Sequence, residues 1–260
     1  MNQAWIIAHK EIIDGLRDIR SLIASLFYAL MGPLVVGLVA VATRDAKPGS
    51  GAAVLTGMMA IFMMVSAFVG GMNVAMDTVA GERERRSLLP LLLNPIGRST
   101  VMFGKWLAVS FFAAIGLAIT GLGFSVVLAT LGTQAASIGL RTFLPIAFGL
   151  FSLPLLAAAV QLLISTVCRG IKEAQTYLSL IVFLPMGLGM FLVFRPPAAL
   201  AWYRFVPLLG QQLQLEGAMN GQHVGWIQPI ALAYLTIGLA VVFLLVAANR
   251  LQRDEIIYGN

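Results

Sequence analysis

Charged side chains are scarce in this sequence, and their scarcity limits the class of protein. Only 11% of the 260 residues are Asp, Glu, Lys or Arg, 59% are hydrophobic, and the mean hydropathy is +0.91. A soluble domain carries about a quarter charged residues, which keep its surface wet. Here the hydrophobic residues form runs long enough for the roughly 20 helical residues that cross a bilayer. The composition therefore predicts an all-α membrane protein.

Cysteine and histidine are almost absent as well. The single cysteine, Cys168, excludes an intramolecular disulfide and a multi-cysteine metal site. The two histidines, His9 and His223, fall in segments predicted on opposite sides of the membrane, and the zinc motif H-E-x-x-H is missing. A G-x-S-x-G motif is also missing, and no serine–lysine or paired-aspartate site can be assembled at membrane depth. We expect no metal site, no catalytic residue and no enzymatic activity in this chain.

The sequence also lacks a motif for binding ATP. The nearest fragment to the phosphate loop G-x-x-x-x-G-K-[ST] is Gly104-Lys105-Trp106, which has neither the glycine spacing nor the Ser/Thr. All eleven acidic residues lie in predicted loops or near span ends. Ion-coupled carriers usually hold a charged group in mid-membrane despite its cost. We therefore expect no cofactor on this chain, and an energy source on another subunit.

The basic residues indicate an orientation rather than a nucleic-acid partner. The formal net charge is +6, but no aromatic-plus-basic cluster of the kind found in nucleic-acid binders is present. With a cytoplasmic N-terminus, the inner segments hold twelve Lys and Arg and the outer segments hold five. Basic residues gather in cytoplasmic loops of membrane proteins. Both termini are therefore predicted in the cytoplasm.

Six apolar segments are predicted to span the membrane within one domain, residues 1–260. The predicted spans are residues 21–43, 52–76, 101–131, 142–167, 177–194 and 227–248. Between the last two, residues 195–226 are too polar and too rich in proline for a plain span. Because this segment also contains apolar pieces, we expect short interfacial or re-entrant helices on the external side.

Residues 4–20 are predicted to form an amphipathic helix in the membrane interface. Apolar residues such as Trp5 and Leu16 recur at three- and four-residue spacing, while Lys10 and Glu11 are assigned to the other side. This pattern is typical of a helix lying in the plane of the membrane. The alternative is an ordinary helix packed on a soluble partner.

Some polar residues lie within the predicted spans. They are Ser66, Asn73, Gln161 and Ser165. Such side chains could line a transport path, but hydrogen bonding between packed helices is their more frequent role. Both interpretations stay open.

Residues 77–100, here called the coupling segment, carry the strongest signal. They combine charges of alternating sign with five leucines between residues 88 and 93, and they lie between the second and third spans on the cytoplasmic side. A short helix that docks into a groove of a soluble partner needs this combination. A helix lying flat on the membrane is the alternative. The expected partner contacts are Gly81, Glu82, Arg83, Glu84, Arg85, Arg86, Ser87, Leu88, Leu91 and Leu92.

This segment resembles that of the type-2 ABC-transporter permeases. The family carries a motif close to G-E-[KR]-E-[RK]-x-[TS]-L-E-x-L-L-x-x-P-x-x-R, followed shortly by G-K. The chain reads G-E-R-E-R-R-S-L-L-P-L-L over residues 81–92, then Pro95, Arg98 and Gly104-Lys105. Leu89 replaces the second glutamate, and Pro90 follows it, so the helix is expected to begin or bend there. Residues 76–82 and 205–212 are similar to the NatB-like sodium-extrusion group, although its large external insertion is missing.

The resemblance implies a division of labour. A separate ABC ATPase, carrying ATP and Mg²⁺, would bind the helix at residues 82–93. Two permease copies, identical or paralogous, would assemble, and the substrate path would lie between the two copies. The complex would export its cargo from a bacterial or archaeal cell across the inner (plasma) membrane, surrounded by lipid. The local similarity favours Na⁺, and the apolar spans favour an amphipathic or lipid-like molecule. A drug or a peptide is a further alternative. The alternative function is a membrane scaffold that transports nothing and recruits a soluble protein through the same helix.

Overall fold

The computed structural model describes residues 3–43, 52–85, 87, 97–131, 140–194, 201–222 and 224–251. These residues are almost entirely helical and contain no strand, so the predicted all-α class is confirmed. The elements are α1 (Gln3–Arg17), α2 (Ile19–Ala42), α3 (Ala52–Ala75), the π-helix η1 (Met76–Gly81), α4 (Glu82–Glu84), α6 (Arg98–Leu131), α7 (Leu140–Val167), α8 (Ile171–Phe194), the 3-10 helix η3 (Ala201–Phe205), α9 (Leu209–Met219) and α10 (Ile227–Arg250).

Six of these helices are long and apolar enough to cross a membrane, which confirms the predicted number of spans. They are α2, α3 with its continuation to Glu84, α6, α7, α8 and α10. The helices extend beyond the predicted spans at several ends: α8 begins at Ile171 rather than at residue 177, and α6 begins at Arg98 rather than at residue 101. Polar first turns account for the difference, because hydropathy marks the apolar part of a helix and not its hydrogen-bonded ends.

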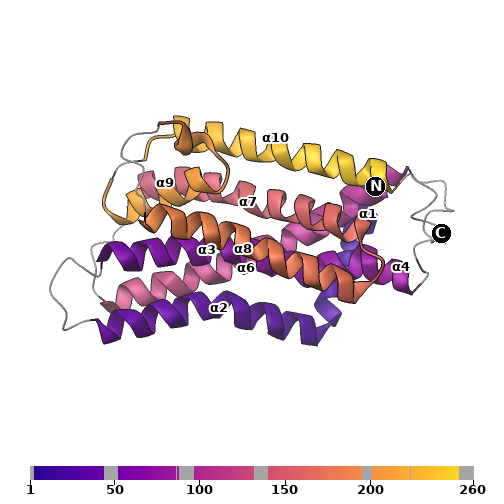
Figure 1. The fold of residues 1–260 in the computed structure, drawn as a ribbon, viewed down its shortest axis with the longest axis horizontal. Coiled ribbons are helices and arrows are strands. Elements are labelled where there is room, and N and C mark those ends of the chain that lie inside the picture. The colour runs from indigo at the N-terminus through magenta and orange to yellow at the C-terminus, as the bar shows by residue number, and fades with distance from the viewer. Residues whose placement is uncertain are drawn as a thin grey trace.

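The helices form one elongated bundle, as Figure 1 shows. The most extensive contacts join α7 to α10 and α3 to α6. The most apolar stretch of α7 is 61% buried within the chain, whereas those of α2 and α8 are only 22% buried. Thus α7 is central, and α2 and α8 present apolar side chains to the surroundings.

Glycines bring α3 and α6 into backbone contact. A Cβ atom on Gly116 would lie 3.0 Å from the Cα atom of Gly70, and one on Gly70 would lie 3.0 Å from the carbonyl oxygen of Phe112. Small residues at such positions allow helices to approach closely, which strengthens packing where lipid provides no hydrophobic driving force.

The N-terminal helix is shorter than predicted and packs with a different face. It ends at Arg17 because the Asp18 side chain accepts hydrogen bonds from the backbone N–H and the hydroxyl of Ser21 and so caps α2. Its buried residues are Ala4, Ile7, Ala8 and Glu11, which lie against α6, whereas Trp5 and Leu16 are exposed. The assignment of Glu11 to the polar side was therefore wrong.

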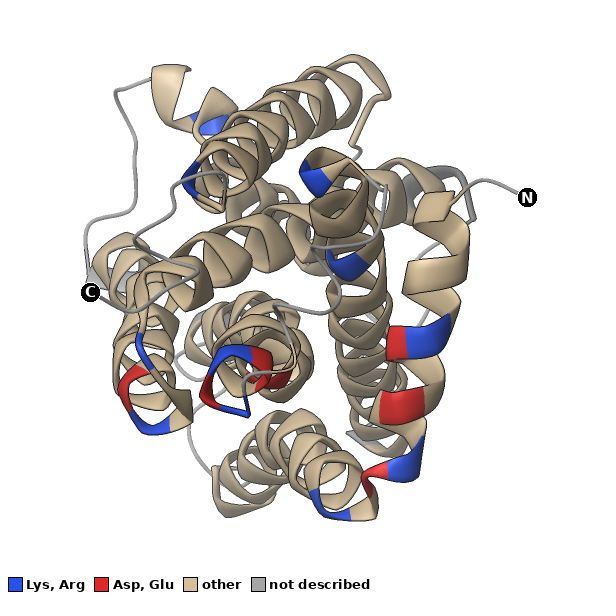
Figure 2. Cartoon of the chain, turned by 90° about the vertical axis from the view of Figure 1, so that its right-hand side faces the viewer, with Lys and Arg blue, Asp and Glu red and all other residues tan. Residues whose placement is uncertain are grey.

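The two ends of the bundle differ in character. The end with α1, α4 and the first turn of α8, here called the charged end, carries most of the charged side chains in the described residues, as Figure 2 shows in a view onto that end. The opposite end, here called the α9 end, contains η3 and α9 (Figure 1). Helix α9 contacts α3, α7, α8 and α10, so it is a short helix inserted among the spans.

Candidate functional site

The coupling segment begins where α3 changes into a π-helix. In η1 every residue except Asp77 is buried, and two backbone groups of η1 bond to side chains of other helices. The Thr78 carbonyl oxygen accepts from Lys105 Nζ at 2.6 Å, and the Ala80 N–H donates to Ser165 Oγ at 3.1 Å. A π-turn leaves the regular hydrogen-bond ladder and is often found at functional positions. Here α6 and α7 supply the missing partners.

Lys105 forms the centre of a buried ionic cluster. Its side chain is 1% exposed, and Nζ lies 2.8 Å from Glu11 Oε1 of α1 and 2.8 Å from Glu82 Oε2 of α4. With the Thr78 carbonyl, these two carboxylates occupy the three donors of the ammonium group. A buried charge is strongly unfavourable unless it is paired and hydrogen-bonded. The cluster satisfies both conditions.

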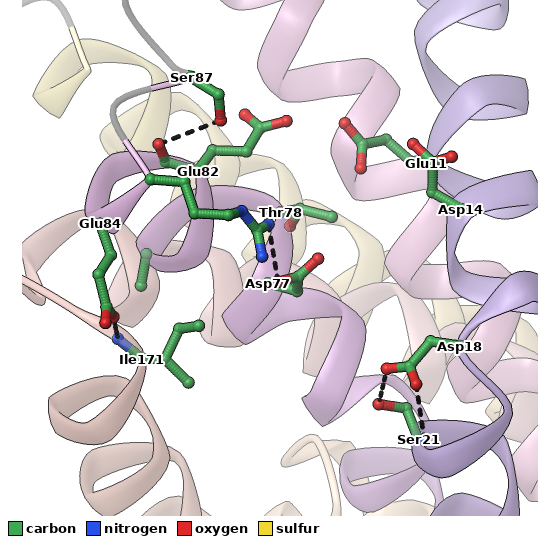
Figure 3. A network of polar contacts seen from close by, with 12 residues as sticks. Glu11, Asp14, Asp18, Ser21, Asp77, Thr78, Glu82, Glu84, Ser87 and Ile171 are labelled. Atoms are coloured by element: carbon green, nitrogen blue, oxygen red, sulfur yellow. Dashed lines mark hydrogen bonds and ion pairs between the residues drawn. The ribbon is translucent and has the colours of Figure 1, made fainter.

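Lys10 extends the cluster to the surface. Its Nζ lies 3.3 Å from Glu11 Oε1 and 3.4 Å from Glu82 Oε1, and its side chain is 53% exposed. Burial disfavours the charged ammonium, but the attraction of Glu11 and Glu82 outweighs it and raises the pKa of Lys10. Figure 3 shows the carboxylates of Glu11 and Glu82 directed toward each other from α1 and α4. Two lysines hold them together.

The G-K pair of the motif has a structural explanation. A Cβ atom on Gly104 would lie 2.8 Å from the Ala4 carbonyl oxygen, so only glycine lets α1 lie directly on α6. The next residue, Lys105, then reaches Glu11, about two turns further along α1 than Ala4. Gly104 permits the close approach, and Lys105 fixes it by charge.

The other charged residues of α4 bind the turn between α7 and α8. Arg83 donates to the carbonyl oxygens of Cys168 at 2.7 Å and Thr166 at 3.1 Å. Glu84 Oε2 accepts from the Ile171 N–H at 2.8 Å, an interaction visible in Figure 3. Carbonyls at a helix C-terminus and N–H groups at an N-terminus lack partners within the helix. Arg83 and Glu84 thus complete both helix ends and attach the coupling segment to them.

Much of the predicted partner-contact set is therefore engaged within the chain. Gly81 and Glu82 are buried, Arg85 pairs with Asp77 at 2.8 Å, and Ser87 Oγ donates to the Glu82 carbonyl at 3.3 Å. Arg86, Leu88, Leu91 and Leu92 lie outside the described residues. Docking of the coupling segment on a partner stays a prediction.

The four polar residues singled out in the spans all bond to neighbouring helices. Ser66 shares a 2.7 Å hydrogen bond with Thr120, and Asn73 donates to Ser25 Oγ at 3.5 Å. Gln161 donates to the Phe68 carbonyl, and Ser165 accepts from Ala80 as described above. These contacts are those expected of helix packing. They do not test whether the residues line a path.

Sequence reasoning missed the α1 and α6 members of the cluster. One signal was available: residues 4, 7, 8 and 11 follow the spacing of one helix face, which places Glu11 beside Ala4 and Ala8. A carboxylate on an otherwise apolar face predicts a buried cationic partner. The identity of that partner could not be read from the spacing.

A comparison with known families agrees with this architecture. The sequence model described as "ABC-2 family transporter protein" matches residues 5–256. The chain belongs to the ABC-2 transporter family. The family-level resemblance in the coupling segment is therefore confirmed.

Three curated relatives support the ABC-2 assignment. The ABC transporter permease protein NatB of Bacillus subtilis (strain 168) is 35% identical over 162 residues, which cover 58% of this chain and 40% of that protein. The Probable ABC transporter permease protein NosY of Stutzerimonas stutzeri is 29% identical over 151 residues, covering 58% and 53%. NosY of Pseudomonas aeruginosa is 31% identical over 126 residues, covering 46% and 43%. The ABC-2 chain thus spans about half the length of the curated relatives it matches.

Proposed function

We propose that the chain is the membrane permease subunit of an ATP-driven exporter. A separate ATPase, holding ATP and Mg²⁺, docks on residues 82–93 and supplies the energy. Family membership supports a transporter role, and the missing phosphate loop is the reason for placing ATP on a partner. The observation that carries the proposal is the attachment of α4 to four other elements of the bundle.

The attachment makes α4 suitable for transmitting force. Glu82 is held to α1 and α6 through Lys105, Arg83 to the end of α7, and Glu84 to the start of α8. Removing one partner of a buried, hydrogen-bonded ion pair costs about 3–5 kcal/mol, so the Lys105 contacts resist separation. The hydrogen bonds of Arg83 contribute less, about 1–3 kcal/mol, because they join a charge to neutral carbonyls. A displacement of the docking helix therefore moves α1, α6, α7 and α8 with it. That is the property needed to convert closure of an ATPase into alternating access.

The exported cargo is proposed to cross between two copies of the chain, identical or paralogous. The exposed apolar sides of α2 and α8 are available for contact with lipid or with the second copy. Among cargoes we favour Na⁺, because of the resemblance to the sodium-extrusion group. An amphipathic or lipid-like molecule, a drug or a peptide are the alternatives that a transport assay would separate.

The test is co-purification of the partner. Native chain and Leu88→Asp/Leu92→Asp would be purified from membranes in mild detergent, and a bound phosphate-loop ATPase would be identified by mass spectrometry. We expect the ATPase to accompany the native chain and to be lost from the variant. Ile256→Asp/Ile257→Asp adds the same charges near the C-terminus and should retain the ATPase.

The second candidate is the scaffold, which the same leucine-rich segment supports. Under the scaffold function, a soluble protein would accompany the native chain and would be lost from Leu88→Asp/Leu92→Asp. That protein would have no ATPase activity. If no ATPase accompanied the native chain, the exporter proposal would be overturned in favour of the scaffold.

A further inference from the structure

The most polar buried surface outside the charged end belongs to α9. Gln211 and Gln212 are each 1% exposed and Gln214 is 5% exposed, although α9 is enclosed by four apolar helices. Apolar residues would pack there without the cost of removing amides from water. Three buried glutamines on one short helix therefore need an explanation other than packing.

Gln211 is explained by the local backbone. Its Oε1 accepts from the Leu208 N–H at 2.6 Å, and its Nε2 donates to Thr236 Oγ1 at 2.9 Å and Ser152 Oγ at 3.4 Å. Leu208 has a φ of 73°, which is strained for a residue with a side chain. Gln211 stabilises this strained start of α9 and ties it to α7 and α10. All of its hydrogen-bonding groups are used within the fold.

Gln212 and Glu216 make a different arrangement one turn apart. Gln212 Nε2 donates to Glu216 Oε1 at 2.8 Å and to the Gly189 carbonyl of α8 at 3.3 Å. A donor nitrogen thus lies between a carboxylate oxygen and a carbonyl oxygen. Gln212 Oε1 is close by, because a Cβ atom on Gly189 would lie 3.0 Å from it. Two oxygens, one from α8 and one from α9, therefore accept from a single donor nitrogen, and the oxygen of the same Gln212 amide lies beside α8.

Glu216 has no compensating cation among the residues that the structure describes. Among the described residues, none of the ion pairs includes Glu216, and all other acidic residues lie at the charged end. Glu216 is half-buried, and burial raises its pKa while the hydrogen bond from Gln212 opposes the rise. An ionisable residue placed at such cost within a membrane domain marks a pathway or a binding site by default.

We propose that Glu216, Gln212 and the Gly189 carbonyl form a binding site for a small monovalent cation. A turn of the Gln212 amide replaces its nitrogen by its oxygen, so that a carboxylate, an amide oxygen and a backbone carbonyl face one ion. Hard cations bind such oxygens. The exposed side of Glu216 leaves room for water to complete the shell.

The position of this site relates it to the proposed function. It lies near α3, because the Ile61 side chain of α3 packs against Gly189, where a Cβ atom would collide with it. Under the exporter proposal, the exposed side of α8 is available to the second copy and the α9 end faces outward, so the site would meet the cation near its exit. This location rests on the proposed function, whereas cation binding does not.

The first test measures cation binding by the full chain in lipid nanodiscs. The melting temperature would be followed by intrinsic fluorescence while NaCl replaces choline chloride at constant ionic strength. Ligands that bind only the folded state raise the melting temperature by mass action. We expect a saturable rise for the native chain and, for Glu216→Gln, an apparent Na⁺ affinity at least about tenfold weaker. Glu173→Gln, the same change at an exposed carboxylate of the charged end, should match the native chain.

A second test needs no substitution. Dicyclohexylcarbodiimide modifies protonated carboxyl groups in apolar surroundings, and the modified peptide can be quantified by mass spectrometry. We expect labelling of Glu216 that NaCl suppresses and choline chloride does not. Equal labelling in both salts, or a sodium-dependent melting shift that Glu216→Gln retains in full, would overturn the site. Retention of the ATPase by Glu216→Gln would show that such a failure concerns this inference and not the exporter proposal.

Discussion

The two ends of the bundle bury polar groups in opposite ways. At the charged end, Lys105 meets Glu11 and Glu82 at 2.8 Å each, so charge of one sign is balanced by the other. At the α9 end, as far as the structure describes it, the buried side chains of α9 include neutral amides, and the one carboxylate, Glu216, has no cationic partner. A balanced cluster fixes helices together. A carboxylate whose charge has no cationic partner would be stabilised by binding a cation.

Lys105→Met should produce the largest effect. It leaves Glu11 and Glu82 buried without their shared ammonium, which should lower the free energy of unfolding by about 3–5 kcal/mol. Urea or thermal unfolding in nanodiscs would measure the change. Lys172→Met, at an exposed position of the same end, is the matched control and should change little.

The same cluster offers a sharper test of whether the balance of positive and negative charge stabilises it. Adding Glu11→Gln and Glu82→Gln to Lys105→Met removes the unpaired charges, so the triple variant should be more stable than Lys105→Met alone. If it were less stable, the cluster would act through its individual hydrogen bonds and not through charge balance.

Arg83→Ala should have the next largest effect. It removes two hydrogen bonds to the end of α7 and leaves buried carbonyls without a partner, a loss of about 1–3 kcal/mol. Hydrogen exchange should become faster at residues 166–171. Arg85→Ala is the control, because its pairing with Asp77 is exposed and such pairs contribute about 0–1 kcal/mol. Equal effects of the two substitutions would contradict the anchoring role of Arg83.

At the α9 end, Gln211→Leu and Gln214→Leu should have different effects on the free energy of unfolding. The Gln211 amide makes hydrogen bonds through both its oxygen and its nitrogen, whereas the Gln214 nitrogen makes none with the residues that the structure describes. Gln211 caps α9, so its loss should cost about 1–2 kcal/mol. Gln214 Nε2 is buried without a hydrogen-bond partner, and replacing the side chain removes an unsatisfied donor. We expect Gln214→Leu to be neutral or slightly stabilising in the same unfolding measurement. A large loss for Gln214→Leu would show that its amide has a partner in the membrane.

The spans were predictable because their signal is local. An apolar run of sufficient length has few alternatives to a membrane-spanning helix, since every backbone polar group must be satisfied within lipid. The predicted spans therefore agree with α2, α3, α6, α7, α8 and α10 except at their ends. The coupling segment was found in the same way, through a motif that is contiguous in sequence.

The partners of the charged residues were not predictable from any such pattern. Glu11 and Lys105 are 94 residues apart, and Lys105 and Glu82 are 23 apart. The charges of residues 82–84 were interpreted as contacts with another protein, which stays a prediction. Their contacts within the chain, by which Glu82, Arg83 and Glu84 join helices, were not foreseen. An exposed charge and a buried, paired charge are identical in sequence.

The sequence by itself determined the class, the six spans and the family, because hydrophobic length and a contiguous motif are local properties. Only the tertiary structure decided which face of α1 is buried, that α9 enters the bundle, and which carboxylates are compensated. Those outcomes depend on which side chains meet across helices far apart in the chain. These long-range contacts are the difference between the two carboxylates: Glu82 is paired with two lysines, whereas Glu216 accepts a hydrogen bond from one amide.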